Sequence, residues 1–249
     1  MSEAAARNLK VVIEYDGSAY VGWERQKNGL GIQEVMEDAV HTITRERVVV
    51  EGSGRTDAGV HALGQVASFR IDKEIQVEKL RLGINAVLPP DIAVLLIEEV
   101  PSDFHARRSA KSKRYRYTIL NGPARRPHFR HVSYHFPQPL DEAAMDEAAG
   151  YLVGEHDFTA FAREADQKKT CVRTILEARV VRDGAFLYID VVGTGFLYNM
   201  VRIITGTLIE VGAGKRDPGS VPALLLSKRR EQAGYTVPAQ GLALVQVDY

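Results

Sequence analysis

The sequence predicts an α+β fold built from two ferredoxin-like halves, and two observations lead to that class. Apolar runs follow the order strand, helix, strand, strand, helix, strand over residues 1–105, and a similar order recurs over residues 106–249. This βαββαβ order is typical of ferredoxin-like folds. The dipeptide Asp183-Gly184 lies between two apolar runs and is a hairpin signal, which favours antiparallel pairing. We therefore expect the two halves to share one mixed, mainly antiparallel sheet.

The elements of the first half follow from residue type and spacing. Short runs rich in Val and Ile indicate strands, and apolar residues at intervals of three and four indicate helices. A glycine-rich segment joins the two central strands. The expected elements are strands at Leu9–Tyr15, Arg47–Gly52, Gln65–Ile71 and Ile92–Val100, and helices at Ile32–Ile43 and Val77–Val87.

The second half repeats these signals after a join near residues 101–112. Asp141 is a candidate helix N-cap, because its side chain can accept a hydrogen bond from the first helical turn. A long apolar helix that contains Arg202 precedes the last strand. The expected elements are strands at Lys113–Ile119, His131–His135, Thr174–Val181, Phe186–Val192 and Leu242–Val247, and helices that begin at Asp141 and cover Phe196–Val211.

Composition indicates a globular protein. The chain has 249 residues, of which 45% are hydrophobic, and this is enough for a substantial core. Its single cysteine cannot form an internal disulfide. The nearly uncharged run Val191–Ile209 contains Asn, Arg, Thr and Gly, so it lacks the apolar continuity of a membrane span. The N-terminus is short and polar with no signal-like apolar segment after it, and we therefore expect a cytoplasmic protein that does not enter a membrane.

The formal net charge is zero, which by itself argues against a nucleic-acid-binding protein. The distribution of charge argues the other way, because cations gather in three clusters that have aromatic residues between them. Such interleaving of cations and aromatic rings favours RNA binding over a merely solvated face. The cations of the clusters are Arg107, Arg108, Lys111, Lys113, Arg114 and Arg116, then Arg125 and Arg126, then Lys168, Lys169 and Arg173.

The most specific segment of the chain is Gly54-Arg55-Thr56-Asp57-Ala58-Gly59-Val60-His61-Ala62. It places one carboxylate between two cations, and its glycines would let a substrate approach the backbone closely. A turn capped by an aspartate is the alternative for an isolated Asp-Gly pair. The whole string resembles the active-site motif of the TruA family of tRNA pseudouridine synthases. Further matching motifs extend the resemblance over the chain, namely Tyr15-Asp16-Gly17, Gly22-Trp23-Glu24-Arg25-Gln26 and Asp103-Phe104-His105-Ala106-Arg107.

The resemblance implies a pseudouridine synthase fold with helices on one side of the sheet and an active-site cleft on the other. It implies that Asp57 is the catalytic residue and that Arg55 holds a nucleotide flipped out of the RNA. Tyr115 would stack on the flipped base, which has lost its neighbours in the RNA, and Leu242 would line the same pocket. Arg202 would pair with Asp57 and favour its ionised form, although an arginine that reaches solvent along its own stem is the alternative.

For the other cations we expect contacts with RNA phosphates, made by Arg25, Arg107, Lys111 and Arg114. The resemblance implies an enzyme that isomerises uridine to pseudouridine at positions 38, 39 and 40 of the tRNA anticodon stem-loop. It also implies a homodimer that needs no small-molecule cofactor. Whether Asp57 attacks the nucleoside or removes a ribose proton stays open.

Two alternative functions remain. A non-catalytic tRNA-binding protein or chaperone on the same fold would keep the basic clusters but lose Asp57. A nucleosidase that acts on small molecules would not need the basic clusters. A metal site at His128, His131 and His135 is disfavoured, because their spacing does not place all three on one face of a strand. We expect no metal and no cofactor.

Overall fold

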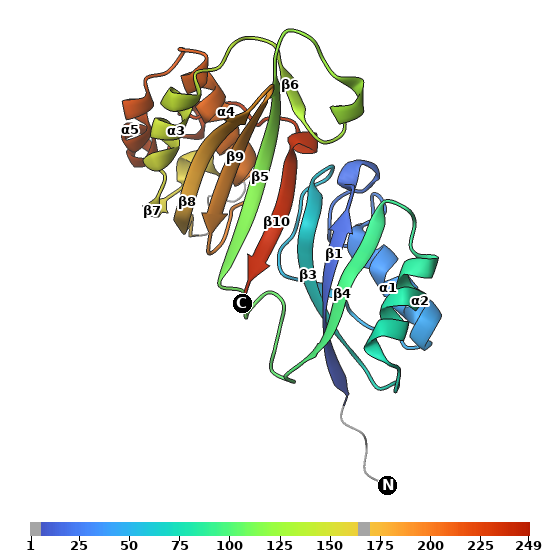
Figure 1. Ribbon diagram of the computed structural model, residues 1–249. Helices are drawn as coiled ribbons and strands as arrows, with labels where there is room; N and C mark the ends of the chain where they lie inside the picture. The colour runs from blue at the N-terminus through green and yellow to red at the C-terminus, as the bar shows by residue number, and fades with distance from the viewer. Residues whose placement is uncertain (1–5, 164–169) are drawn as a thin grey trace. The chain divides into compact units, whose positions relative to one another are not determined.

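A computed structural model of the chain describes residues 6–163 and 170–249 (Figure 1). The chain folds into two compact units. The first unit comprises the residues up to 111 together with 244–249, and the second comprises residues 112–243. Both units combine helices with mainly antiparallel strands, so the α+β class expected from the sequence is confirmed.

The first unit has the ferredoxin-like order of elements. Three of its strands are neighbours in the order β4-β1-β3, and both pairs are antiparallel. The short strand β2 pairs with Ala67 and Ser68 of β3, and β10 follows β3 in the sheet order. The elements are β1 (Arg7–Tyr15), α1 (Ile32–Thr44), β2 (Glu51–Gly52), β3 (His61–Ile71), α2 (Val77–Val87), β4 (Ile92–Val100) and β10 (Leu242–Asp248), of which the first two residues of β10 belong to the second unit.

Alternation along β1 builds the core of the first unit. Leu9, Val11 and Ile13 are fully buried and alternate with more exposed residues. Side chains with this period lie on one face of a strand. Figure 1 shows α1 and α2 over one face of this sheet, and the two helices bury Met36 and Leu80 completely. The apolar core therefore lies between the helices and the sheet.

The strand expected at Arg47–Gly52 is wrong over its first four residues. Only Glu51 and Gly52 pair with β3, whereas the Val50 N–H donates to the Glu37 carboxylate of α1 at 3.1 Å. A backbone donor that is satisfied by a side chain is not available for a strand ladder. Strand β3 starts earlier than expected, so β2 and β3 enclose residues 53–60, which we call the motif loop.

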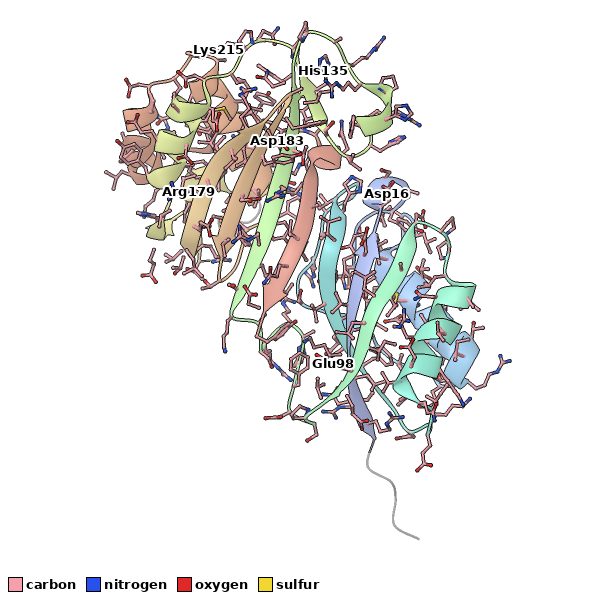
Figure 2. The ribbon with its side chains drawn as sticks, in the orientation of Figure 1. Asp16, Glu98, His135, Arg179, Asp183 and Lys215 are labelled. Atoms are coloured by element: carbon pink, nitrogen blue, oxygen red, sulfur yellow. The ribbon has the colours of Figure 1, made fainter. Side chains whose placement is uncertain are left out.

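The second unit contains an antiparallel sheet in the order β5-β9-β8-β7, with β6 parallel to β5. The Asp183-Gly184 turn joins β8 to β9 as expected, and Asp183 is labelled in Figure 2. Asp141 caps α3 by accepting from the Ala144 N–H at 3.0 Å. Strand β7 and helix α5 have no counterpart among the expected elements. The elements are β5 (Ser112–Asn121), β6 (Tyr134–Phe136), α3 (Glu142–Gly150), β7 (Gly154–Asp157), β8 (Val172–Asp183), β9 (Phe186–Gly193), α4 (Met200–Gly212) and α5 (Val221–Ser227).

Strand β6 is shorter than the strand expected at His131–His135 and covers Tyr134–Phe136. The chain before it forms a turn in which the Val132 N–H donates to the Phe129 carbonyl at 3.1 Å. The Ser133 hydroxyl donates to the same carbonyl at 2.8 Å. These bonds use backbone groups that a ladder would need, so the strand begins later.

Helix α4 starts at Met200, whereas the sequence indicated a start at Phe196. Asn199 has a φ of 60° and lies in the left-handed region, which interrupts a right-handed helix at that residue. The helix is buried along most of its length. The late start leaves Asn199 as the N-cap, one turn before Arg202.

A close backbone approach fixes the segment after α5 against α4. A Cβ at Gly206 would lie 1.9 Å from the Tyr235 carbonyl oxygen, so only glycine leaves room for this contact. Next to it, the Thr207 hydroxyl accepts from the Gly234 N–H at 2.9 Å. This hydrogen bond is buried, and it satisfies a backbone donor that the irregular segment leaves without a partner of its own.

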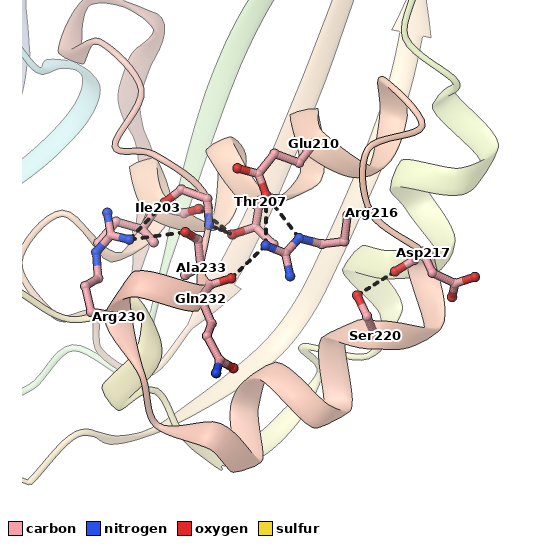
Figure 3. A network of polar contacts seen from close by, with 10 residues as sticks. Ile203, Thr207, Glu210, Arg216, Asp217, Ser220, Arg230, Gln232 and Ala233 are labelled. Atoms are coloured by element: carbon pink, nitrogen blue, oxygen red, sulfur yellow. Dashed lines mark hydrogen bonds and ion pairs between the residues drawn. The ribbon is translucent and has the colours of Figure 1, made fainter.

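Two arginines extend this network, which Figure 3 shows from close by. Arg216 pairs with Glu210 of α4 at 2.8 Å and donates to the Gln232 carbonyl at 2.7 Å. Arg230 donates to the Gly234 carbonyl at 3.0 Å. Arg216 therefore holds the chain between α5 and β10 to α4, and Arg230 braces that chain against itself.

We expect Gly206→Ala to destabilise the protein, because the added methyl group would collide with the Tyr235 carbonyl. Forcing extra carbon into a packed site costs about 1 to 3 kcal/mol. Gly150→Ala is the matched control, since Gly150 is also helical but its added Cβ would meet nothing within 4 Å. Urea unfolding of both variants measures the difference. Equal free energies of unfolding would contradict the close approach.

Candidate active site

The motif loop carries Asp57 on a tight turn. The Val60 N–H donates to the Asp57 carbonyl at 3.1 Å, which closes a four-residue turn over residues 57–60. Gly59, the third residue of this turn, has a φ of 74°, a conformation that favours glycine. Asp57 is half-buried, and Arg55 is exposed. The turn therefore fixes the backbone at Asp57 while its side chain keeps access to solvent.

A second segment, residues 16–23, lies directly against the motif loop. The Trp23 N–H donates to the Thr56 carbonyl at 3.1 Å, and the Gly59 N–H donates to the Tyr20 carbonyl at 3.3 Å. A Cβ at Gly22 would lie 2.5 Å from the Thr56 carbonyl oxygen, and the φ of Gly22 is 109°. Glycine at position 22 is therefore required by the packing of one backbone on the other.

His61 attaches the end of the motif loop to the start of the same segment. Its Nδ1 accepts from the Gly17 N–H at 3.1 Å and lies 3.2 Å from an Asp16 carboxylate oxygen. Asp16 is labelled in Figure 2, where β1 ends. A Cβ at Gly17 would lie 2.0 Å from the Val60 carbonyl oxygen. The matching motif Tyr15-Asp16-Gly17 thus has a structural role beside the loop.

A buried polar cluster lies beneath the motif loop. The Tyr15 hydroxyl is 2.8 Å from the Thr56 Oγ1, and both side chains are buried. Gln65 of β3 donates to the Gly54 carbonyl at 3.0 Å and accepts from the Ser53 hydroxyl at 2.7 Å. Burial raises the pKa of Tyr15 to about 12, because the phenolate would lose its hydration inside the protein. The cluster is therefore neutral at physiological pH.

The two exposed arginines near the motif loop have carboxylate partners in the same unit. Arg55 pairs with Glu24 at 2.7 Å, and Arg25 pairs with Glu37 at 3.0 Å. Both arginine side chains are more than half exposed. Exposed ion pairs of this kind contribute only about 0 to 1 kcal/mol, so a phosphate can replace the carboxylate at little cost.

In the second unit, Tyr115 and Leu242 are buried. Tyr115 of β5 is 7% exposed and makes an edge-to-face contact with Phe196, with ring centroids 5.0 Å apart. Leu242 begins β10 and is 5% exposed. The neighbouring Tyr117 is fully buried and donates to the Pro238 carbonyl at 2.7 Å.

Arg202 of α4 is oriented by two acceptors. Its Nε donates to the Val237 carbonyl at 2.8 Å, and its Nη1 donates to the Asn199 side-chain oxygen at 2.8 Å. The guanidinium plane is therefore set by the second unit itself, through the N-cap of α4 and the chain before β10. Asp57 belongs to the first unit, and the expected pair of Arg202 with Asp57 stays a prediction.

The cations expected on the RNA differ in their surroundings. Arg107 and Lys111 are exposed. Arg114 instead pairs with Glu177 at 3.2 Å and with Asp190 at 3.6 Å. A phosphate at Arg114 would therefore compete with two carboxylates. Lys168 and Lys169 of the third basic cluster lie outside the described residues.

Neither a metal cluster nor a membrane helix is found in the part of the chain that the structure describes. Over residues 6–163 and 170–249, no group of three or more His, Cys, Asp or Glu side chains could hold a metal ion. Within the same ranges, no helix is long and apolar enough to cross a membrane. His135, one of the three histidines weighed as ligands, has its Nε2 2.8 Å from the Gly122 carbonyl oxygen.

Sequence reasoning missed the side chains that support the motif loop. Tyr15, Thr56 and Gln65 all lie within quoted motifs or expected strands, but the sequence assigns them no common role. Gln65 did carry a usable signal, because it is a polar residue inside an otherwise apolar run. A buried polar side chain needs hydrogen-bond partners, and these indicate which backbone it holds.

An α+β scaffold that carries an aspartate on a fixed turn agrees with the pseudouridine synthase fold that the sequence motifs indicate. A family model described as tRNA pseudouridine synthase matches residues 11–107 and 148–249, so the chain belongs to this family. The motif loop, Arg202 and Leu242 lie within the matched ranges, whereas Lys111, Arg114 and Tyr115 lie between them.

Three curated relatives carry the name tRNA pseudouridine synthase A. The chain is 50% identical to the protein from Geobacter sp. over 244 residues, which cover 98% of this chain and 99% of the relative. It is 49% identical to the protein from Geotalea uraniireducens and 46% identical to that from Acetivibrio thermocellus, in each case over 243 residues that cover 98% of this chain and 100% of the relative.

We expect Tyr15 to make the protein sensitive to alkali. Its pKa is about 12 in the folded state and near 10 in an unfolded chain, so its contribution to stability is complete below pH 10 and is lost between pH 10 and 12. Two pKa units correspond to about 3 kcal/mol. Urea unfolding across this pH range should show a smaller loss for Tyr15→Phe than for the wild type. The exposed Tyr151→Phe variant should behave like the wild type, and three identical pH dependences would contradict the expectation.

Proposed function

We propose that this protein converts uridine to pseudouridine in tRNA and that Asp57 is its catalytic residue. Membership of the tRNA pseudouridine synthase family supports the reaction, and the position of Asp57 on a fixed turn supports the residue. The reaction breaks the bond between N1 of uracil and C1′ of the ribose, and it joins C5 to C1′ after the base has turned. N1 gains a proton and C5 loses one, so no redox partner or transferred group is needed.

An ionised carboxylate suits either role that Asp57 can have. As a nucleophile it would attack the nucleoside, and as a base it would remove a ribose proton. Arg202 is proposed to face this carboxylate, because an adjacent guanidinium favours the charged form. Its two hydrogen bonds to Val237 and Asn199 support this assignment, since they limit the directions in which the guanidinium can turn.

Binding of the target nucleotide is proposed for three further residues. A uridine must leave the base stack to react, and Tyr115 offers a ring beside Phe196 on which a flipped base can stack. Leu242 would add an apolar wall. Arg55 would hold the flipped nucleotide in place, and its exposed pair with Glu24 is weak enough to be exchanged for the RNA.

The family resemblance extends the proposal to the site and the assembly. We propose uridines 38, 39 and 40 of the tRNA anticodon stem-loop as targets, and a homodimer in the cytoplasm as the working form. Arg25, Arg107, Lys111 and Arg114 would contact phosphates. A non-catalytic tRNA-binding protein on the same fold is the second candidate, and the first experiment below separates the two.

We expect Asp57→Asn to abolish turnover while tRNA affinity stays within about an order of magnitude, because the substitution removes the ionisable group and little else. The measurement is tritium release from tRNA labelled at C5 of uridine. Asp38→Asn is the matched control, since it makes the same change on the exposed face of α1. Normal tritium release by Asp57→Asn would contradict the catalytic assignment. Wild-type protein that binds tRNA without releasing tritium would favour the non-catalytic candidate.

We expect Arg107→Ala to weaken tRNA binding and to reduce its salt dependence. Each phosphate contact contributes about 0.7 to 0.9 to the slope of log affinity against log salt concentration. Lys79→Ala is the control, because Lys79 is an exposed cation on α2 of the same unit. Binding isotherms at several salt concentrations give both slopes. If the two variants share one slope, Arg107 does not contact a phosphate.

A further inference from the structure

The motif loop poses a structural problem that its own backbone does not solve. It connects a strand of two residues to β3, and residues 53–60 contain no helix or strand. A loop that must hold a reacting group within a fraction of an ångström needs other contacts on both sides of that group. Gly54 directly precedes Arg55, and Thr56 directly precedes Asp57. Contacts to Gly54 and Thr56 would therefore control the positions of Arg55 and Asp57.

Gln65 makes the contacts to the residues that precede Arg55. It is fully buried, and its amide oxygen accepts from the Ser53 hydroxyl at 2.7 Å and the Val66 N–H at 3.2 Å. Its amide nitrogen donates to the Gly54 carbonyl at 3.0 Å and to the Tyr15 hydroxyl at 3.5 Å. The amide thus uses two acceptor sites and two donor protons, which is its full capacity. Only one orientation of the side chain satisfies these partners.

Tyr15 makes the contact to Thr56, the residue that precedes Asp57. Its hydroxyl is 2.8 Å from the Thr56 Oγ1, and the Trp23 N–H donates to the carbonyl of the same threonine at 3.1 Å. Thr56 is therefore held at both its side chain and its backbone. Since Gln65 also binds the Tyr15 hydroxyl, the restraints before Arg55 and before Asp57 belong to one connected cluster.

Stability alone does not account for a polar cluster at this place. Gln65 lies opposite Ile13 of β1, whose other inward residues Leu9 and Val11 are apolar and fully buried. An apolar residue at position 65 would suit that environment, but it would leave Gly54 and Ser53 without their buried partner. Buried polar groups that are all satisfied specify one arrangement of the backbone, at no clear gain in stability over an apolar core.

We propose that Tyr15, Thr56 and Gln65 are positioning residues that aim Asp57 and Arg55 at the target nucleotide. This inference rests on the proposed catalytic role of Asp57. None of the three needs to touch the RNA. Their effect is on the geometry of the loop, so they should change the rate of the chemical step and leave tRNA affinity nearly unchanged.

The test is a pair of substitutions at Thr56. Thr56→Val keeps the shape of the side chain and removes the hydroxyl, whereas Thr56→Ser keeps the hydroxyl and removes a methyl group. We expect Thr56→Val to lower the single-turnover rate constant by about 10- to 100-fold, with the tRNA dissociation constant nearly unchanged. Thr56→Ser should stay close to the wild type. Equal rate constants for the two variants would overturn the proposal.

A double-mutant cycle with Tyr15→Phe examines the hydrogen bond itself. Because Tyr15→Phe and Thr56→Val remove the same bond, the double variant should be no slower than the slower single variant. Rate losses that multiply would show that the two side chains act separately, and would overturn the proposal. Tyr15→Phe keeps the ring, so it carries the test if Thr56→Val does not fold.

Asn85→Leu separates positioning from general destabilisation. The Asn85 amide also clamps backbone in the first unit, since it donates to the Val94 carbonyl and accepts from the Val94 N–H, each at 2.8 Å. This variant should lose stability but keep its rate constant. Hydrogen exchange should quicken at residues 54–60 in Thr56→Val and not in Asn85→Leu. A rate loss in Asn85→Leu that matches Thr56→Val at equal stability would overturn the proposal.

Asp57→Asn in the same assay separates the catalytic role of Asp57 from the positioning role of Tyr15, Thr56 and Gln65. If Asp57→Asn is active, the catalytic assignment fails, whatever the Thr56 variants do. If Asp57→Asn is inactive while Thr56→Val and Thr56→Ser are equally fast, the positioning role alone fails.

Discussion

The buried hydrogen bond between the Tyr15 hydroxyl and Thr56 is the contact on which the candidate site depends most. It joins the end of β1 to the residue before Asp57, and it is shielded from water at both ends. A hydrogen bond in such a place is stronger than one at the surface, and the loss of either partner leaves a buried polar group unsatisfied. The rest of the motif loop can be irregular because this bond and Gln65 replace the ladder that a longer β2 would have supplied.

The two arginine side chains near the motif loop are exposed, unlike the buried cluster beneath it. Arg55 and Arg25 are exposed and paired with carboxylates, so a chain with zero net charge still presents cations at its surface. In the free protein each cation has a neighbour that limits repulsion. An exposed pair contributes little, so the cation can exchange its carboxylate for a phosphate, and the released counterions favour that exchange.

Much of the fold could be predicted from periodicity, and the error at β2 shows what periodicity does not detect. The expected helix Val77–Val87 and strand Ile92–Val100 are confirmed to the residue, because their apolar spacing and their breakers agree. The expected strand at Arg47–Gly52 was too long because the Glu37 carboxylate takes the Val50 N–H. Pattern methods detect which face of an element is apolar, but they do not detect a side chain that captures a backbone donor from a distant position.

The candidate site shows the same limit of sequence patterns. Asp57 and Arg55 could be singled out because they belong to one short string, whereas the contact of Tyr15 with Thr56 spans 41 positions and leaves no local pattern. The glycines also acquire a different explanation. Gly59 is needed by the turn, and Gly17 and Gly22 are needed where one backbone packs on another. Those three glycines therefore fix the loop and the segment that packs against it.

The order of the motif loop in the free protein affects the free energy of RNA binding. A loop that is ordered by its own glycines, its turn and its buried cluster has already lost its conformational freedom when the protein folds. Under the proposed function, the RNA would meet a preformed arrangement, and its binding energy would not be consumed in ordering the loop. Under the same proposal, adjustment to the RNA would fall to the exposed side chains of Arg55 and Arg25, while the backbone that carries Asp57 would stay in place.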